Sequence, residues 1–499
     1  MNPAPVHHHR QNEPMPMPNN YSSRRDFLKK SALTGVAASV AGALTGCASP
    51  GGAGAITLPS GVTLGARIGE TRPRPSGQKP VHQLTTAPLA RVRTAFIGCG
   101  GRGTSLIGDV LGVEFADIVA VCDLRPERAN SAAGTVEKAR GKRPAVFGGT
   151  ESIWEKLCDL PDIDVVYVAT PWEWHVPMAL RAMARGQHAF VEVAAAVTVD
   201  DCWRLVDTSE RTQRHCLILE NCCYGENELF VLNLARKGVF GELNHAECAY
   251  LHDLRSLLFD LNGEGGWRRH YHLAYNGNLY PTHGLGPVAQ YLGIGRGDQF
   301  KFLVSTSSPE QGLSKWRQDH NPNRGQQAGE KYLCGDMNTS LLKTELGRTI
   351  LLQHDVVSPR PYSRINALYG TGAVFFDYPA RLAVNQPKLF GLDANSSEEW
   401  LSPGDLAKMR EKFTHPLWRK LAERARGSGH GGMDFVENWR HLDCLRQGLT
   451  PDITVYDAAA WSCLIEISAR SVATGSAPVP VPDFTRGLWK SRAPLGIVS

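Results

Sequence analysis

The sequence predicts an α/β protein: an N-terminal Rossmann doubly wound parallel sheet, followed by an α+β domain with a mainly antiparallel open sheet. Three observations carry this prediction. An apolar strand runs directly into a glycine-rich loop at Gly98, strands and helices then alternate as far as Leu219, and strand-like segments dominate afterwards. We therefore assign residues 91–223 to the first domain and residues 224–499 to the second.

Residues 1–47 are predicted to be an export signal. Ser23 to Lys29 spells SRRDFLK, a twin-arginine pattern, and the weakly apolar run behind it is shorter than the roughly 20 residues of a membrane span. The run ends in LTGC, which resembles a bacterial lipobox, so Cys47 is a candidate for lipidation; a plain cleavage site is the alternative. We expect twin-arginine export to the periplasm and a lipid anchor, without a transmembrane span.

Residues 48–90 are predicted to be a flexible linker, because Gly, Pro, Ser and Thr dominate and apolar periodicity is weak. The formal net charge of +5 is mild and gives no indication of nucleic-acid binding. The 12 cysteines include no CxxC pair, and folding before export takes place in a reducing compartment, so we expect mostly buried thiols. The adjacent Cys222 and Cys223 have no explanation in the sequence.

A glycine-rich loop follows the strand that starts at Val92. Its sequence, Gly98-Cys99-Gly100-Gly101-Arg102-Gly103, is GxGxxG between a strand and a helical stretch. Gly98 permits a tight turn, Gly100 lets the backbone approach a pyrophosphate, and Gly103 allows close helix packing. The helix that follows offers unpaired N–H groups to an anion. The loop therefore predicts a dinucleotide cofactor.

The next apolar strand, Ile118 to Cys122, ends in Asp123, twenty residues after Gly103. A carboxylate there would accept hydrogen bonds from the adenosine ribose and repel a 2′-phosphate, which favours NAD over NADP, although nearby Arg125 weakens that inference. The alternative is a surface aspartate that caps the helix beginning at Pro126.

Strands and helices continue to alternate, with strands over 164–169, 188–192 and 215–219 and helices over 174–185 and 199–212. Ligands of doubly wound sheets bind outside the carboxyl ends of the strands. Polar residues collect at three such ends, namely TPWEWH over 170–175, Glu192, and Glu220-Asn221. We predict that these residues lie near the nicotinamide.

The second domain begins with a helix over 225–237. Strands are predicted over 244–250, 300–306, 340–345, 349–355, 363–370 and 373–377, and one sheet face is expected to cover the cofactor site. The same face is a candidate surface for a homo-oligomer. A final amphipathic helix over 457–473 is expected to pack on the body.

A dense polar cluster runs from Trp267 to Gly284. Tyr280 and His283 are three residues apart, so they face one cleft if a helix begins at Pro281. Tyr, Thr and His beside a helix start can bind sugar hydroxyls and move protons; a core or capping role for His283 is the alternative. The histidines lack the spacing of metal ligands, so we predict no metal site.

Two stretches, NLYPTHGLGP over 278–287 and GHGGMD over 429–434, resemble glycoside hydrolase family 109, the NAD-dependent α-N-acetylgalactosaminidases of the Gfo/Idh/MocA superfamily. TPWEWH, LENCCYG, HDLR and SPRPYSR support the resemblance in order, from about Val92 to the last helix. Most Gfo/Idh/MocA enzymes carry Glu-Lys-Pro where this chain has Glu192-Val193-Ala194. The missing catalytic lysine favours a glycosidase over an oxidoreductase.

The resemblance implies a set of site residues. NAD would be held by Gly101, Arg102, Asp123, Trp172, Glu173, Trp174, His175, Glu192, Val193 and Asn221. The substrate would contact Tyr250, Arg268, Tyr280, Pro281, Thr282, His283 and Tyr362, with Tyr280 also near the nicotinamide. The neighbouring Arg269 competes for the role of Arg268.

The resemblance further implies a retaining exo-glycosidase for glycans with a terminal α-linked N-acetylgalactosamine. A hydride passes from sugar C3 to NAD, His283 or Tyr224 takes the proton from C2, the anomeric group leaves, water adds, and the hydride returns. Two alternatives stay open: an exported sugar oxidoreductase with tightly bound NAD(P), and a sugar-binding lipoprotein whose Rossmann half is a relic.

Overall fold

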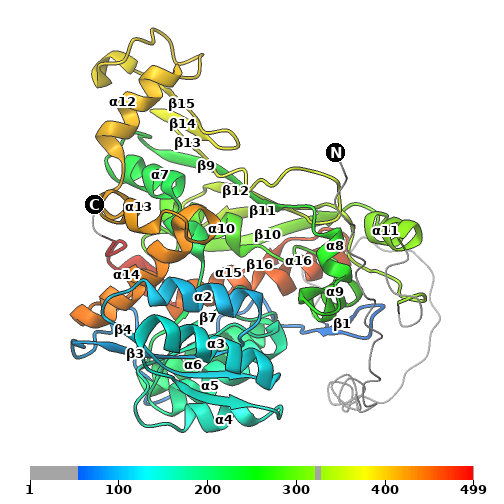
Figure 1. The fold of residues 1–499 in the computed structure, drawn as a ribbon. Coiled ribbons are helices and arrows are strands. Elements are labelled where there is room, and N and C mark those ends of the chain that lie inside the picture. The colour runs from blue at the N-terminus through cyan, green and yellow to red at the C-terminus, as the bar shows by residue number, and fades with distance from the viewer. Residues whose placement is uncertain (1–53, 321–326, 498–499) are drawn as a thin grey trace, which may run out of the picture. The chain divides into compact units, whose positions relative to one another are not determined.

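The computed structural model describes residues 54–320 and 327–497. Two sheets lie one above the other in this part of the chain, with helices between and around them (Figure 1). The predicted export signal, including Cys47, lies outside the described residues. None of the helices within the described ranges has the length and apolar character needed to cross a membrane.

The first sheet has the predicted doubly wound arrangement. Its six strands are all parallel in the order β5-β4-β3-β6-β7-β8. The strands are β3 (Val92–Ile97), β4 (Ala116–Asp123), β5 (Ala145–Gly148), β6 (Val165–Val168), β7 (His188–Val191) and β8 (Cys216–Ile218). The helices are α2 (Gly101–Leu111), α3 (Pro126–Arg140), α4 (Ile153–Cys158), α5 (Trp172–Ala184) and α6 (Val199–Thr212). The strand order reverses between β3 and β6, which is where such sheets bind nucleotides.

The second sheet is mixed but mainly antiparallel, as predicted. Its order is β15-β14-β13-β9-β12-β11-β10-β16, and β9 runs parallel to β12. The strands are β9 (Leu243–Leu251), β10 (Phe300–Ser307), β11 (Asn338–Thr344), β12 (Thr349–Asp355), β13 (Ala367–Gly370), β14 (Ala373–Phe376), β15 (Arg381–Val384) and β16 (Val479–Pro480). β13 starts later than predicted because Ile365 and Asn366 have positive φ angles, which interrupt an extended strand.

The second domain also contains helices, some of which pack on its own sheet, whereas α14 (Met433–Gln447) packs on α2 and β3 of the first domain. These helices are η1 (Asn221–Tyr224), α7 (Glu226–Arg236), α8 (Arg255–Phe259), η2 (Glu264–Gly266), α9 (Arg268–Ala274), α10 (Thr282–Leu292), α11 (Gly312–His320), η3 (Pro387–Phe390), α12 (Pro403–Phe413), α13 (Pro416–Ala425), η4 (Gly429–Gly432), α14 and η5 (Leu488–Lys490). α10 begins next to Pro281, as predicted, and packs on β9.

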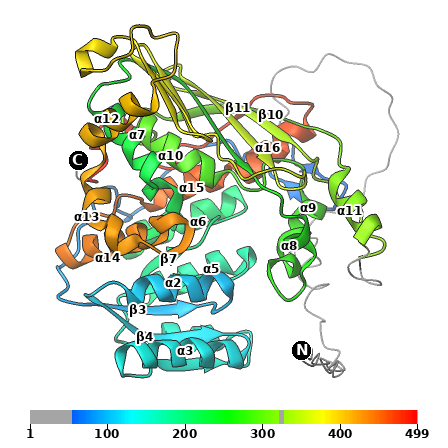
Figure 2. The same ribbon diagram turned by 45° about the horizontal axis from the view of Figure 1, so that its top comes forward.

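The predicted amphipathic helix over 457–473 is instead two helices, α15 (Val455–Ser462) and α16 (Leu464–Ala473), and almost all of it is buried. α15 contacts α6 and β8 of the first sheet, whereas α16 contacts β10 of the second. The pair thus forms a middle layer between the two sheets (Figure 2). Because both faces of the pair are covered, the predicted amphipathic character is wrong, whereas the predicted packing on the body is confirmed.

The flexible linker predicted over 48–90 is wrong for residues 54–90. This segment forms a short hairpin of β1 (Ile56–Thr57) and β2 (Thr63–Leu64), and Leu64 and Val81 are buried in the common core. Val81 N donates to the hydroxyl of Tyr456 at 3.0 Å, and Arg74 is paired with Glu210. The apolar residues are too widely spaced to give a periodic signal, but Leu58, Leu64, Ile68 and Val81 are buried in the core.

Candidate active site

The glycine-rich loop leaves open space for a ligand. A Cβ at Gly98 would lie 2.3 Å from the carbonyl oxygen of Ala169, and one at Gly103 would lie 1.8 Å from that of Gly98. A Cβ at Gly101, in contrast, would meet nothing within 4 Å, and no side chain caps the start of α2 at Gly100. The first turn of α2 therefore presents free N–H groups to open space, which fits a diphosphate.

Asp123 braces this loop from the end of β4. Its Oδ2 accepts a hydrogen bond from Cys99 N at 2.7 Å, and its Oδ1 accepts one from Arg125 N at 2.9 Å. The second contact shapes the turn before α3, but Asp123 is buried and Arg125 is the N-cap of α3, so the alternative of a surface aspartate that caps this helix is wrong. The carboxylate lies at the strand end beside the glycine loop, where a ribose is expected.

A buried ion network continues from the loop. Arg102 bonds Glu192 at 2.5 Å and Asp434 at 2.7 Å, and Asp434 also accepts from Asn221 at 2.5 Å and from His430 at 2.9 Å. Burial alone would raise the pKa of Asp434, but the hydrogen bond from His430 and the charge of Arg102 hold this pKa well below its usual range. The ionised Asp434 thus joins α2, the ends of β7 and β8, and the GHGGMD stretch.

Sequence reasoning used GHGGMD only as a mark of resemblance and missed the roles of His430 and Asp434. The His430 side chain is 62% exposed while Asp434 is fully buried beneath it. The hydrogen bond to Asp434 raises the pKa of His430. The signal that could have found them is the run of glycines, because Gly431 and Gly432 both have positive φ angles and form a tight turn.

The residues of TPWEWH divide into two groups. Trp172 Nε1 donates to the carbonyl of Val193 at 2.9 Å, and the buried His175 has its ring nitrogens 2.7 Å and 2.8 Å from the carbonyls of Ala194 and Thr170. His175 therefore ties two loops together through both ring nitrogens, and its contact with the cofactor stays a prediction. Its position in the second turn of α5 directs it into the protein. Glu173 and Trp174 are less buried, at the start of the same helix.

His283 lies at the centre of the second polar cluster. Its Nδ1 is 2.7 Å from Glu220 Oε1, and its Nε2 is 3.3 Å from the hydroxyl of Tyr280. The ring of Tyr250 stacks on Tyr280 with centroids 4.4 Å apart and meets His283 edge-on at 5.5 Å. Tyr280 and His283 therefore do lie together. Burial raises the pKa of Tyr280 well above its usual value, so its hydroxyl is protonated and can donate.

The structure distinguishes Arg268 from Arg269. The Arg268 guanidinium lies 5.1 Å from the Tyr280 ring centroid and 5.7 Å from that of Trp172, and it pairs with Glu264 at 2.9 Å. Arg269 instead is buried against Glu330 at 2.9 Å and donates to two main-chain carbonyls. Arg268 is thus the arginine of the aromatic cluster.

Tyr362 lies at the exposed edge of this cluster. Its ring is 6.0 Å from Tyr250 and 5.0 Å from His252, a residue that sequence reasoning did not single out. Behind this edge, a cavity of about 10 Å³ lies among Trp172, Tyr250, Arg268 and Tyr280. That volume holds about one water molecule. A sugar would therefore bind at the outer rim, where Tyr362 and His283 are accessible.

Three further predicted residues are buried. Tyr224 was predicted as a possible base, but its hydroxyl lies 3.3 Å from both His441 and Asp452, inside the second domain, so that prediction is wrong. The single turn of η1 points Tyr224 toward α14, and burial raises its pKa well above the usual value. Pro281 and Thr282 form the buried start of α10.

The adjacent cysteines are free and buried, in line with the expected thiols. Cys222 also lies near two other residues of types that can bind metal ions. Glu220, Cys222 and His283 each have one such ligand atom within 4.8 Å of the others, which their spacing in the sequence did not reveal. The hydrogen bond between Glu220 and His283 already joins two of these donors.

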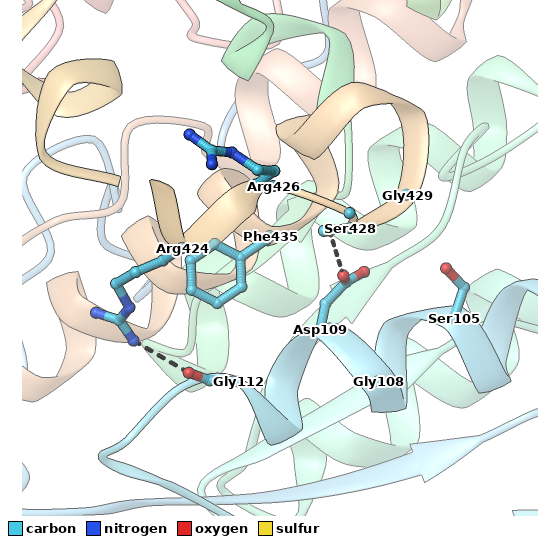
Figure 3. Close-up of a pocket in the computed structure, with 10 residues that line it drawn as sticks. Ser105, Gly108, Asp109, Gly112, Arg424, Arg426, Ser428, Gly429 and Phe435 are labelled. Carbon is cyan, nitrogen blue, oxygen red and sulfur yellow. Dashed lines mark hydrogen bonds between the residues drawn. The ribbon is translucent and has the colours of Figure 1, made fainter. Parts of the chain in front are cut away.

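A larger cavity, of about 610 Å³, lies elsewhere, between α2 and residues 424–429 (Figure 3). Asp109 lines it and accepts a hydrogen bond from Ser428 at 2.6 Å. Burial raises the pKa of Asp109 to about 6. The residues that line this cavity include none of the predicted site residues, so the cavity lies apart from the polar cluster around His283.

Comparisons with known proteins bear on both halves of this arrangement. A family model described as "Oxidoreductase family, NAD-binding Rossmann fold" matches residues 92–219. A second model, "Glycosyl hydrolase 109, C-terminal domain", matches residues 224–491.

The chain is 44% identical over 477 residues to an alpha-N-acetylgalactosaminidase of Shewanella oneidensis, covering 95% of this chain and 98% of that one. It is 45% identical over 478 residues to a glycosyl hydrolase family 109 protein of Solibacter usitatus, covering 95% and 99%. Among solved structures, levoglucosan dehydrogenase with NADH and levoglucosan has a TM-score of 0.59 at 19% identity, covering 79% of this chain and 100% of that one. An NAD binding oxidoreductase from Klebsiella pneumoniae has a TM-score of 0.59 at 14% identity, covering 78% and 98%. These two structures share the fold.

Proposed function

Because this chain belongs to glycoside hydrolase family 109, we propose that it is a retaining exo-glycosidase that releases terminal α-linked N-acetylgalactosamine with NAD as its catalytic cofactor. One observation carries the proposal. The imidazole of His283 is hydrogen-bonded to Tyr280 and to Glu220, which follows the carboxyl end of β8 and directly precedes Asn221 in the chain. This is the side of a doubly wound sheet on which a nicotinamide binds.

The described residues fit NAD. The backbone at Gly100 and Gly101 is open to a diphosphate, while Gly98 and Gly103 are closed to any side chain. Asp123 ends β4, where it would meet the ribose, and Glu192 and Asn221 follow the ends of β7 and β8, where they would face the nicotinamide. When bound, NAD supplies a reversible hydride acceptor for the C3 position of the sugar.

The side chains of the site supply the proton transfers. With C3 oxidised, the proton on C2 becomes acidic, and His283 Nε2 accepts it while the group on C1 leaves. The departed aglycone oxygen takes up one proton of the water whose hydroxyl adds to C1, and His283 returns its proton to C2 before C3 is reduced again. Arg268 and Tyr362 are placed to bind sugar hydroxyls.

The carboxylates of this site support such a mechanism. Most glycosidases place two carboxylates on either side of the scissile bond. Here Glu220 is bonded to His283, whereas Glu192 and Asp434 are both bonded to Arg102. These three carboxylates are thus engaged with a cation or an imidazole, and the imidazole of His283 is the proton acceptor in the proposed mechanism.

The test is hydrolysis of p-nitrophenyl α-N-acetylgalactosaminide by protein purified with its nucleotide. We expect release of p-nitrophenol without net NADH, and a loss of roughly 10²- to 10⁴-fold in kcat for His283→Ala. A fully active His283→Ala variant would exclude this base. Net NADH and an oxidised sugar without aglycone release would select the sugar oxidoreductase. A panel of α- and β-linked aryl glycosides, with and without the acetamido group, tests the sugar.

We further propose that the enzyme is exported by the twin-arginine route and anchored through Cys47. The support is the SRRDFLK pattern and the lipobox-like LTGC. Cell fractionation tests this: the wild type should be found in the periplasmic membrane fraction, and a variant with both arginines 24 and 25 changed to lysine should remain in the cytoplasm. Wild-type protein found only in the cytoplasm would contradict the proposal.

A further inference from the structure

Glu220 is a buried carboxylate with one strong partner. Its side chain is fully buried, and its Oε1 lies 2.7 Å from His283 Nδ1. Burial alone would raise the pKa of Glu220, but the charge that His283 carries in its protonated form and the hydrogen bond from its Nδ1 bring this pKa below its usual value. Moving an ionised carboxylate out of water is energetically unfavourable unless the carboxylate is paired, so the hydrogen bond from His283 stabilises the ionised form of Glu220.

This contact fixes the direction of the hydrogen-bond chain. An ionised carboxylate only accepts, so His283 Nδ1 must carry the hydrogen. In the neutral ring, Nε2 is then the free acceptor, and it faces the protonated hydroxyl of Tyr280 at 3.3 Å. The nitrogen that remains basic is therefore the one directed away from Glu220.

The fold also makes room for this pair. A Cβ at Gly286, one turn after His283 on α10, would lie 2.7 Å from Glu220 Cγ and 3.1 Å from Cys223 Sγ. A side chain at Gly286 would displace the side chain of Glu220. The close approach of the carboxylate to the helix thus depends on a glycine in the same motif as His283.

We propose that Glu220 is a positioning residue that holds His283 in the tautomer with a free Nε2 and stabilises the imidazolium formed when Nε2 takes the sugar C2 proton. This assignment rests on the proposed function. The proton moves from C2 to Nε2, the Nδ1 hydrogen stays shared with Glu220, and Glu220 remains ionised throughout. The same division of roles operates in the Ser-His-Asp triad.

The kinetic test is a double-mutant cycle with Glu220→Gln and His283→Ala. Gln keeps the size of the side chain but removes the charge that orients and stabilises the ring. We expect Glu220→Gln to lower kcat by roughly 10- to 100-fold with KM changed less than about twofold, and to retain NAD. In the His283→Ala background the same change should lower kcat no further. A loss of equal size in both backgrounds, or an unchanged kcat, would overturn the proposal.

A matched control is Glu210→Gln, which removes another buried carboxylate. Glu210 pairs with Arg74 and Arg486, away from the cluster around His283. We expect this variant to have a lower melting temperature but an unchanged kcat. A second variant, Gly286→Ala, should lower kcat as Glu220→Gln does. If Gly286→Ala fails to fold, the double-mutant cycle with Glu220→Gln and His283→Ala still tests the proposal.

A spectroscopic test does not depend on glycosidase activity. In uniformly ¹⁵N-histidine-labelled protein with bound NAD, the His283 signals are those absent from His283→Ala. We expect a protonated Nδ1 and an unprotonated Nε2 at neutral pH, and loss of this single tautomer in Glu220→Gln. The opposite tautomer in the wild type would overturn the proposal. If no aryl glycoside is cleaved but this tautomer is found, the proposed function fails while the orientation of His283 by Glu220 stands.

Discussion

The glycine loop and the cluster around His283 are built in opposite ways. The loop, residues 98–103, is six consecutive residues whose function depends on backbone and on absent side chains. The cluster depends on side chains that come together from distant segments: Glu220 and His283 are 63 residues apart, and Asn221 and Asp434 are 213 apart. A contiguous motif can be found by spacing, whereas an assembled site depends on the topology that brings its members together.

The largest effect is expected inside the loop. In Gly103→Ala the new methyl would collide with the carbonyl of Gly98, 1.8 Å away, so we expect loss of bound NAD and a destabilisation of about 4 kcal/mol or more. Gly101→Ala, where a Cβ meets nothing within 4 Å, is the matched control and should keep its fold. Nucleotide content and thermal melting measure both. If the two variants lost the same amount of bound NAD and of thermal stability, the space around the loop backbone would not be what determines NAD binding and folding.

The adjacent arginines provide the next contrast. Arg268→Ala removes the guanidinium over Tyr280, and we expect kcat/KM to fall roughly 10²-fold with little change in melting temperature. Arg269→Ala leaves the largely covered Glu330 with only the hydroxyl of Tyr332 as a partner, so it should destabilise the fold by about 3 kcal/mol while the folded enzyme keeps its kcat/KM. The reverse pattern would transfer the substrate contact to Arg269.

Two tyrosines test whether the cluster has been delimited correctly. Tyr280→Phe removes the hydroxyl that faces His283 Nε2, and we expect kcat to fall about 10-fold. Tyr224→Phe removes a hydroxyl bound to Asp452 inside the second domain, so we expect a loss of about 1 kcal/mol in stability and a kcat within about twofold of wild type. A collapse of kcat in Tyr224→Phe would restore that residue as a base.

The smallest effect lies at Asp109, which joins α2 to the loop that carries His430. Its pKa of about 6 in the folded state exceeds that of an unfolded aspartate, about 3.9. Between these values the unfolded state ionises first, so the free energy of unfolding falls as pH rises, and the loss is complete above pH 6. Asp109→Asn should therefore be more stable than wild type at pH 8, by about 1 kcal/mol, and show no gain at pH 4. Denaturation at both pH values measures this; a gain that is the same at both would contradict it.

Most of the first sheet could be predicted because β3 is an apolar run that leads into the glycine loop, and β4, β6, β7 and β8 are apolar runs that lead into polar residues. β5 was missed because it lies at the sheet edge, partly exposed, and lacks such a run. In the site, spacing alone identified Gly98, Gly103 and Asp123. It could not choose between Arg268 and Arg269, since adjacent helix positions point in different directions.

Other errors have the same origin. Tyr224 follows LENC in the sequence and stands close to the site, yet one turn of η1 directs it into the core. Asp434 lies far along the chain, and only the packing of α14 on η1 brings it to Asn221. Which way a side chain points, and which distant segment it meets, are decided by tertiary packing.

The segment over residues 54–90 has a consequence for how the protein is made. Val81 bonds Tyr456, 375 residues later, and Arg470 bonds the carbonyl of Gly65 at 2.8 Å. A ribosome releases the early segment long before these partners exist. The segment must wait, with Leu64 and Val81 uncovered, until nearly the whole chain has been synthesised, and such non-local contacts form slowly. Completion of the body is thus a late step in biosynthesis, at a time when the newly made chain still depends on protection from aggregation.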